Sequence, residues 1–418
     1  MPTEASTELL TGLKDKATWL RIHSIRSTTE AGSGHPTSCA SIAEIMSALF
    51  FSVMRYDPAN PANPANDVFV LSKGHAAPAL YAAWAEAGYI PVEDLLRLRK
   101  LACDLEGHPP TTLPFVDVAT GSLGQGLSAG LGMALSTQLD GRDQRIYVLL
   151  GDGESAEGSV WEAAAMASHR GLSNLCAIVD VNRLGQSAPT MLEHDMDSHQ
   201  ARWAAFGWQA LVVDGHDIAG LLGAFEQAAT TGDRPTVILA RTFKGKGIAL
   251  AENKDGWHGK PFPKGEQTDE ILQQLEAQLS GTHFSWTPKT PASNSVRLPE
   301  AASPPGPPYS LGDQVATRQA FGSALAALAE TDPRIVALDG DVKNSTFTQD
   351  TEKTSPQRFF QGFIAEQNMA GAAIGGGEWL TGPVVTALYG GGLLWLATLS
   401  ILGQAFYNVE VSRYALYT

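Results

Sequence analysis

The sequence has few cysteines and too little positive charge to balance its acids. The three cysteines, Cys39, Cys103 and Cys176, are scattered and form no CxxC pair, which excludes a disulfide framework and indicates a reducing compartment. Lysine and arginine number 29 against 44 aspartates and glutamates, a net charge of −15. This balance argues against nucleic acid as a partner and against an anionic membrane surface. The chain opens without a basic segment followed by an apolar one, so we expect a cytoplasmic protein.

The composition is that of a globular protein, with 44% hydrophobic residues and room in 418 residues for two or three domains. The proline- and serine-rich stretch 286–312 predicts a linker between domains 1–285 and 313–374. Residues 375–418 form an atypical apolar tail of unknown structure. Its run 383–406 is long enough for a membrane helix, but Gly390, Gly391 and Gly392 interrupt it and basic flanks are nearly absent. Membrane association is therefore disfavoured.

The stretch from Val148 to Gln186 predicts a parallel strand–helix–strand unit. The apolar runs Ile146–Leu150 and Leu175–Val181 predict strands, and the alanine-rich segment Trp161–His169 between them predicts a helix that Gly171 ends. Parallel strands joined by a helix carry their carboxyl ends to the same edge of the sheet. Asp152 and Asn182, which follow the two strands, are therefore expected at one edge.

These two side chains, with the backbone carbonyl of Leu184, form an oxygen-only set that suits Mg²⁺ or Ca²⁺ rather than zinc. The glycines that flank Asp152 would let a phosphate approach the backbone. An ordinary strand-end turn is the simpler interpretation of Gly-Asp-Gly alone. Followed one unit later by Asn182, however, the motif resembles the diphosphate–metal signature of thiamin diphosphate enzymes.

Four histidines lie in loops stiffened by glycine or proline: His35, His75, His108 and His258. Each alone could be a buried or helix-capping imidazole, but four in such loops favour hydrogen bonding and proton transfer at a site. Lys73 lies in the same turn as His75. Lys244, in the loop Lys-Gly-Lys-Gly, suits an anion, although a solvated turn explains it equally well. Ser38 or Ser41 can cap the next helix, whose apolar face is Ile42, Ile45, Met46 and Leu49.

The remaining pattern alternates strands with helices and predicts an α/β fold with a parallel sheet and helices on both faces. Leu9–Thr29 and Thr268–Leu279 predict amphipathic helices in the first domain. In the second, Ala316–Ala329 predicts a helix, and Arg334–Leu338 and Phe359–Ile364 predict strands. Glu366 directly follows the last of these. It is either a carboxylate at a helix start or a partly buried one with a raised pKa that hydrogen-bonds a heterocycle nitrogen.

At this point the chain resembles the transketolase family, in its shorter, animal-type form. The motifs follow one another in the family's order over roughly Leu10 to Ile374, which makes chance agreement negligible. The matching runs are AGSGHPTS, LSKGHAAP, EGHP, DVATGSLGQG, LLGDGESAEGSVWEA, DVNRLGQS, TFKGKG, WHGKP, ATRQAFGSAL, ALDGDVKNST and FIAEQNM.

The resemblance implies thiamin diphosphate as cofactor, a divalent metal, sugar phosphates as substrates and transfer of a two-carbon ketol unit in the pentose phosphate pathway. It implies a homodimer whose sites form between subunits, and it gives roles to residues of this chain. Asp152, Asn182 and Leu184 would bind the metal; Gly121, Leu123, Gly153, Gln186, Lys73 and Lys244 the cofactor; Arg318 and Ser345 the substrate phosphate. Glu366 would act on the aminopyrimidine, Glu157 would link the two sites, and His35, His75, His108 and His258 would relay protons.

The resemblance ends near Ile374, where family members continue with the rest of the pyrimidine-binding domain and a third domain. A shifted reading frame or truncated gene is the first explanation, a genuine short variant the second and a membrane anchor the third. We expect weak or no activity from the chain as written. The alternative function is an inactive fragment or half-enzyme that binds thiamin diphosphate and needs a partner. A 1-deoxyxylulose-5-phosphate synthase is disfavoured by the motifs EGHP, RLGQS and WHGKP.

Overall fold

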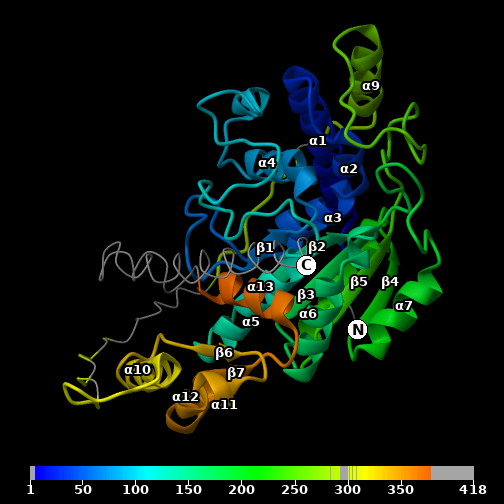
Figure 1. Cartoon of the computed structure of the whole chain (residues 1–418). Coiled ribbons are helices and arrows are strands. Elements are labelled where there is room, and N and C mark those ends of the chain that lie inside the picture. Colours follow the sequence, from blue (N-terminus) through cyan, green and yellow to red (C-terminus); the bar gives the residue numbers. More distant parts are fainter. Residues whose placement is uncertain are drawn as a thin grey trace, which may run out of the picture.

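The first domain is built on a five-stranded parallel sheet in the order β1-β2-β3-β5-β4, as the computed structural model of the chain shows (Figure 1). The model describes residues 5–282, 284–291, 300, 302–303, 305–306 and 308–377. Two of these strands, β2 and β3, lie where the sequence predicted them, because each is a short apolar run that ends at a turn signal. The strands are β1 (Val68–Leu71), β2 (Ile146–Gly151), β3 (Leu175–Val181), β4 (Gln209–Asp214) and β5 (Thr236–Arg241).

Alternating side chains of the central strands form a core on each face of the sheet. On one face, Tyr147 and Leu149 of β2 pack with the helices that start the chain. On the other face, Ile146, Val148 and Leu150 pack with the helices that come before β2 and after β2 and β3 in the chain. The first face carries α1 (Thr7–Ala31), α2 (Pro36–Ser41), α3 (Ala43–Ala48), α4 (Ala77–Glu86) and α8 (Ile218–Thr230), and the second α5 (Gly126–Leu139), α6 (Gly158–His169) and α7 (Met196–Ala205).

Short and irregular turns complete the first domain. A π-helical turn, Leu49–Val53, follows α3, and single 3₁₀ turns occupy Gly74–Ala76, Val92–Arg97 and Glu154–Ala156. Helix α9 (Glu266–Glu276) packs on α1 and closes this part of the chain. No helix among the described residues combines the length and hydropathy needed to cross a bilayer.

The predicted linker returns to the first domain before the chain leaves it. Trp286 packs edge-on against Phe51 with ring centroids 5.2 Å apart, and the Tyr56 amide donates to the Lys289 carbonyl at 2.8 Å. Among the described residues between 286 and 312 there is no helix and no strand, and the linker stays a prediction.

The second domain is small and lies to one side of the first (Figure 1). Its strands are parallel, as expected, but each is only three residues long, because pairing stops where the chain turns away after Asp339 and Gln361. A single 3₁₀ turn, Pro356–Arg358, precedes the last strand. The elements are α10 (Thr317–Thr331), β6 (Ala337–Asp339), α11 (Lys343–Thr346), α12 (Gln349–Thr354), β7 (Phe359–Gln361) and α13 (Glu366–Gly377).

Helix α13 joins the second domain to the first by packing along α5 (Figure 1). Glycine makes this approach possible. A Cβ at Gly375 would lie 1.9 Å from the Ala129 carbonyl oxygen, and one at Gly371 would lie 2.5 Å from the Ser128 side chain. The predicted tail, residues 375–418, lies outside the described residues except for its first three, which continue α13.

Candidate active site at the carboxyl edge of the sheet

Asp152 and Asn182 follow neighbouring strands, as predicted, and both are buried. The Asp152 carboxylate accepts from the Arg183 amide and the Thr190 hydroxyl, each at 2.8 Å. The Leu184 amide donates to the Asn182 side-chain oxygen at 3.2 Å. The turn 183–190 therefore contains Leu184, is hydrogen-bonded to Asp152 and directly follows Asn182. All three predicted metal ligands are connected through it.

The Asp152 carboxylate has the electrostatics of a cation ligand. Burial, with the neighbouring Asp180 carboxylate as the second cause, raises the pKa of Asp152 to about 6 despite the hydrogen bonds it accepts. A buried carboxylate without a cationic partner is destabilising, and a divalent cation would relieve this. Gly153 is exposed, and a Cβ there would meet only Thr190 at 3.4 Å, so the backbone is open to a ligand. The residues fit a hard cation next to a phosphate.

Asp180, which sequence reasoning missed, lies on β3 two residues before Asn182 and is bound by side chains from several loops at this edge. Its carboxylate is fully buried and forms an ion pair with Lys73 at 2.5 Å. The Asn182 amide and the Ser41 hydroxyl each donate to it at 2.8 Å, and the Thr242 hydroxyl donates to it as well. Burial would raise the pKa of Asp180, but the Lys73 ammonium and these hydrogen bonds outweigh burial and hold it low. Lys73, predicted to bind the cofactor, thus has a carboxylate of this chain as its partner.

Glu154 is a second buried carboxylate that the sequence analysis missed. It accepts from the Ser72 hydroxyl, from the Gly124 amide at 2.9 Å and from the Gly151 amide at 3.0 Å. Burial raises the pKa of Glu154. It joins the loops that follow β1, precede α5 and follow β2, so three glycine-rich turns share one anchor. Its place in the run GDGESAEG was the available signal.

Three of the four predicted histidines form one cluster. The ring centroids of His35 and His75 are 4.9 Å apart, those of His35 and His258 4.9 Å, and those of His75 and His258 5.3 Å. Burial, followed by nearby positive groups, lowers the pKa of His35 to about 4 and that of His258 to about 3, and it lowers the pKa of His75 well below the usual value. The three imidazoles are therefore neutral near pH 7 and can donate or accept hydrogen bonds.

His108 lies against Gly121. This glycine has φ +144°, and a Cβ there would come within 2.9 Å of the His108 ring. Burial also lowers the pKa of His108, with Arg99 as the next cause. The structure thus brings together two residues predicted on separate motifs. Leu123 and Glu157 are exposed nearby. Glu157 lies against the same turn, since a Cβ at Gly124 would meet the Glu157 side chain at 2.6 Å. Gln186 is exposed at the tip of the 183–190 turn.

Lys244 connects the histidine cluster to the metal loop. Its buried ammonium donates to the Leu184 carbonyl at 2.9 Å and lies 2.8 Å from Nδ1 of His258. Burial, with Lys73 as the second cause, lowers the pKa of Lys244 to about 8. A buried ammonium whose partners are neutral is suited to an anionic ligand.

One prediction was wrong. Ile42, rather than Ser38 or Ser41, stands at the N-cap of α3, and both serines lie inside the short helix α2, which Pro36 starts.

Glu366 is exposed at the first position of α13, which is the first of its two interpretations, a carboxylate at a helix start.

Arg318 and Ser345 are brought together as expected. An Nη1 atom of Arg318 lies 3.5 Å from the Ser345 hydroxyl, and the guanidinium lies 5.9 Å from the Phe347 ring centroid. Both side chains belong to the second domain. Both side chains are exposed, which leaves the pair accessible to a ligand.

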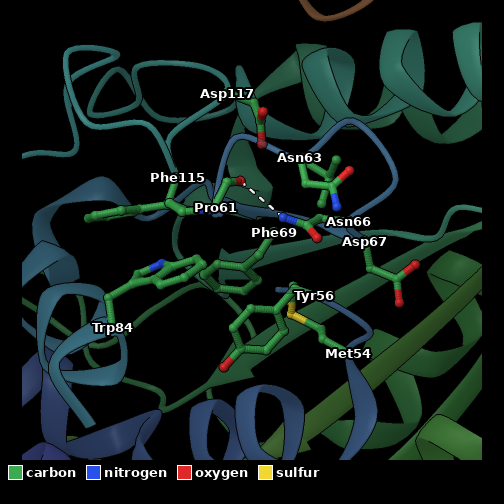
Figure 2. Close-up of a pocket in the computed structure, with 11 residues that line it drawn as sticks. Met54, Tyr56, Pro61, Asn63, Asn66, Asp67, Phe69, Trp84, Phe115 and Asp117 are labelled. Carbon is green, nitrogen blue, oxygen red and sulfur yellow. Dashed lines mark hydrogen bonds between the residues drawn. The ribbon is translucent and has the colours of Figure 1, made fainter. Parts of the chain in front are cut away.

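Two cavities lie elsewhere in the described chain, and neither is lined by the predicted residues. The smaller, about 20 Å³, lies at the amino end of β1 among Tyr56, Trp84 and Phe115, where Asn66 donates to the Pro61 carbonyl (Figure 2). It is too small for more than one water molecule. The larger, about 470 Å³, is lined mainly by apolar side chains of α6 and the turn before α13. Its lining residues Gly158 and Ala365 adjoin Glu157 and Glu366 in sequence.

Comparisons with known proteins agree with this geometry. Residues 13–282 match the family model described as the thiamine diphosphate binding domain of transketolase. Residues 313–391 match its pyrimidine binding domain, which extends past Ile374, where we expected the resemblance to end. A mouse transketolase-like protein 2 is 53% identical over 88% of this chain and 59% of its own length. The human transketolase is 54% identical over 88% of this chain and 58% of its own.

Solved structures give the same result. A transketolase from Pichia stipitis, in complex with sedoheptulose-7-phosphate, is 26% identical with a TM-score of 0.72, covering 88% of this chain and 63% of its own. One from Campylobacter jejuni is 25% identical with a TM-score of 0.73, covering 90% and 64%. The chain spans about three fifths of the length of the curated relatives that it matches. The matched domains, the sheet and the motifs at its carboxyl edge together establish that this chain belongs to the transketolase family.

Proposed function

We propose that this chain binds thiamin diphosphate with Mg²⁺ or Ca²⁺ and serves the transketolase reaction, transfer of a two-carbon ketol unit from a ketose phosphate to an aldose phosphate. The observation that carries the proposal is the connection made by Lys244. Its ammonium contacts both the Leu184 carbonyl of the predicted metal loop and His258 of the histidine cluster. An anion site, a cation site and neutral proton-transfer groups therefore adjoin.

The chain's own oxygens support the metal assignment. Asp152, Asn182 and the Leu184 carbonyl would bind the cation, and Gly153 and Lys244 would face the diphosphate, with Gly121, Leu123 and Gln186 along the rest of the cofactor. Asp180, which is paired with Lys73, accepts a hydrogen bond from the Asn182 side-chain amide and so fixes the orientation of Asn182. When bound, thiamin diphosphate supplies the carbon nucleophile that such ketol transfer requires.

The histidine cluster would hold the hydroxyl and carbonyl oxygens of the sugar and relay protons among them. Neutral imidazoles are suited to this because each offers one donor and one acceptor near pH 7. His35, His75 and His258 form the cluster, and His108 borders it beside Gly121.

Sugar phosphates are the proposed substrates, and the Arg318–Ser345 pair would bind their phosphate. A guanidinium beside a hydroxyl supplies several donors to phosphate oxygens. The Pichia stipitis relative was solved with sedoheptulose-7-phosphate, a sugar phosphate of this class.

A homodimer is the proposed assembly. Glu366 is exposed, and the preceding turn carries Phe363 at 47% and Ile364 at 76% exposure. Apolar side chains beside a predicted catalytic carboxylate favour coverage by a second subunit, in which Glu366 would meet the partner's cofactor and Glu157 would link the two sites.

The second candidate is a half-enzyme that binds thiamin diphosphate but does not complete the reaction. The exposed position of Glu366 in the single chain favours it. Calorimetric titration with thiamin diphosphate and Mg²⁺ tests binding, and no metal-dependent binding would contradict both candidates. A ketol-transfer assay on xylulose 5-phosphate and ribose 5-phosphate then separates them. A cytoplasmic location remains a prediction from cysteine usage.

A further inference from the structure

His216 lies outside the predicted site, in the turn between β4 and α8, and both of its ring nitrogens are engaged. The Phe243 amide donates to Nε2 at 2.9 Å, and Nδ1 lies 3.0 Å from a carboxylate oxygen of Glu44. Because an amide can only donate, Nε2 is the acceptor. The proton of the neutral ring is then on Nδ1, from which it is donated to Glu44. The side chain is 10% exposed, so both bonds are shielded from water.

The Glu44 end of this connection is firmly anchored. An Nη2 atom of Arg21 lies 2.6 Å from the same Glu44 oxygen, and the Arg21 guanidinium also donates to the Ala40 carbonyl at 3.1 and 3.2 Å. Burial would raise the pKa of Glu44, but Arg21 and His216 outweigh it and lower the pKa to about 2. Glu44, a residue of α3, is therefore an anion that Arg21 of α1 holds in place.

The other end of the connection is the residue before Lys244. Phe243 stacks on the His216 ring at 6.0 Å with an interplanar angle of 16°. Two residues on, the Gly245 amide donates to the Thr37 carbonyl at 2.9 Å. His216 and Thr37 thus hold the backbone on either side of Lys244.

The turn that carries His216 is itself pressed onto β5. A Cβ at Gly215 would lie 2.4 Å from the Thr242 side chain, and the Gly215 amide donates to the Arg241 carbonyl at 2.8 Å. These two contacts fix the distance between the turn that carries His216 and the end of β5, where the loop 242–247 begins.

We propose that His216 is a positioning residue for Lys244. By accepting the Phe243 amide and donating to the Arg21-bound Glu44, it fixes the loop 242–247 so that the Lys244 ammonium reaches the Leu184 carbonyl and His258. The consequence for ligand binding rests on the proposed function, in which Lys244 faces the diphosphate. The positioning of the loop does not.

Two substitutions separate the acceptor from the rest of the side chain. His216→Gln places an amide oxygen near the position of Nε2, whereas His216→Asn retains a donor near Nδ1 but does not reach the Phe243 amide. We expect the Phe243 amide to exchange its hydrogen about tenfold faster in the Asn variant and within about twofold of the original rate in the Gln variant. Amides of β3 serve as the control for folding and should not change.

Three results of the exchange experiment would overturn the proposal. These are an unchanged Phe243 rate in the Asn variant, equal acceleration in both variants, and loss of protection throughout β3, which would make His216 a residue of the core. The measurement uses the full chain without ligand, so it decides the positioning role even if thiamin diphosphate does not bind.

The binding consequence is measured by calorimetric titration with thiamin diphosphate and Mg²⁺. We expect the dissociation constant to rise about tenfold in the Asn variant and to stay within about twofold in the Gln variant, with Lys244→Met as the reference for full loss of the ammonium. Equal affinity of the Asn variant and the unsubstituted chain would overturn the link from His216 to Lys244. Absence of binding by the unsubstituted chain would instead contradict the proposed function.

Discussion

The carboxyl edge of the first domain's sheet and the second domain both carry charged residues of the predicted site. They differ in whether these residues are buried or exposed. At the sheet edge, Asp180, Glu154 and Lys244 are buried, and each is bound by side chains or backbone of the same chain. In the second domain, Glu366 and Arg318 are exposed at helix starts. The comparison teaches that one half of the proposed site is organised within the chain, whereas the other presents its groups outward.

The largest test of this comparison is the removal of Lys73. Lys73→Met leaves the Asp180 carboxylate buried without its cation, which costs on the order of 3–5 kcal/mol of the free energy of unfolding. Urea unfolding followed by circular dichroism measures this. The matched control is Lys343→Met in the second domain. Its ion pair with Glu352 spans 2.7 Å but is more than one third exposed, so the expected cost is below about 1 kcal/mol. Equal costs would break the comparison.

The next test concerns Asp152, whose pKa of about 6 lies above its value in the unfolded chain. Its contribution to stability is full below the unfolded pKa and is lost as pH rises through about 6. Asp152→Asn should therefore stabilise the ligand-free chain at pH 7 by on the order of 2 kcal/mol and abolish metal-dependent stabilisation. Melting temperatures with and without Mg²⁺ at pH 5 and pH 7 check this. A metal effect that survives the substitution would exclude Asp152 as a ligand.

A smaller effect is expected from the titration of Lys244. With a pKa of about 8, its ammonium is charged at pH 7 and largely neutral at pH 9. An anion binds the charged form, so the affinity for thiamin diphosphate in saturating Mg²⁺ should fall about tenfold between pH 7 and pH 9. Lys244→Met should bind weakly with little change over this range. A flat profile for the unsubstituted chain would show that the buried ammonium does not face the diphosphate.

The smallest effect on stability is expected at Glu366. Because this carboxylate is exposed, Glu366→Gln should change the free energy of unfolding of the single chain by less than about 0.5 kcal/mol. In a ketol-transfer assay the same variant should lose nearly all activity, if the unsubstituted chain is active. A loss of several kcal/mol of stability would instead mean that Glu366 is a structural residue of this chain.

Much of the first domain was predictable because its signals are local. Strands β2 and β3 are apolar runs that end at Asp152 and Asn182, and parallel pairing alone places those residues at one edge. The same reasoning missed Asp180 and Glu154. Each lies in or beside an apparently ordinary run, and its partners Lys73 and Ser72 are 107 and 82 residues away.

The second domain was harder to predict for a different physical reason. Strands of three residues leave little periodicity to read, so both were predicted too long. Burial of Glu366 depends on what covers the start of α13, and the sequence around it does not determine this. In the single chain Glu366 is an exposed carboxylate at a helix start, one of the two interpretations that the sequence left open.

The sequence by itself determined the residue types and their order: an acid and an amide at neighbouring strand ends, four histidines in stiff loops, and a lysine between glycines. These follow from local propensity, hydrophobic period and turn chemistry. Only the tertiary structure decided which of them meet. In the folded chain three imidazoles form one cluster, and Lys73 forms an ion pair with Asp180 instead of facing a ligand. Lys244 lies between the cluster and the predicted metal loop. Such contacts depend on the packing of distant segments, and burial there is what shifts the pKa values of these groups.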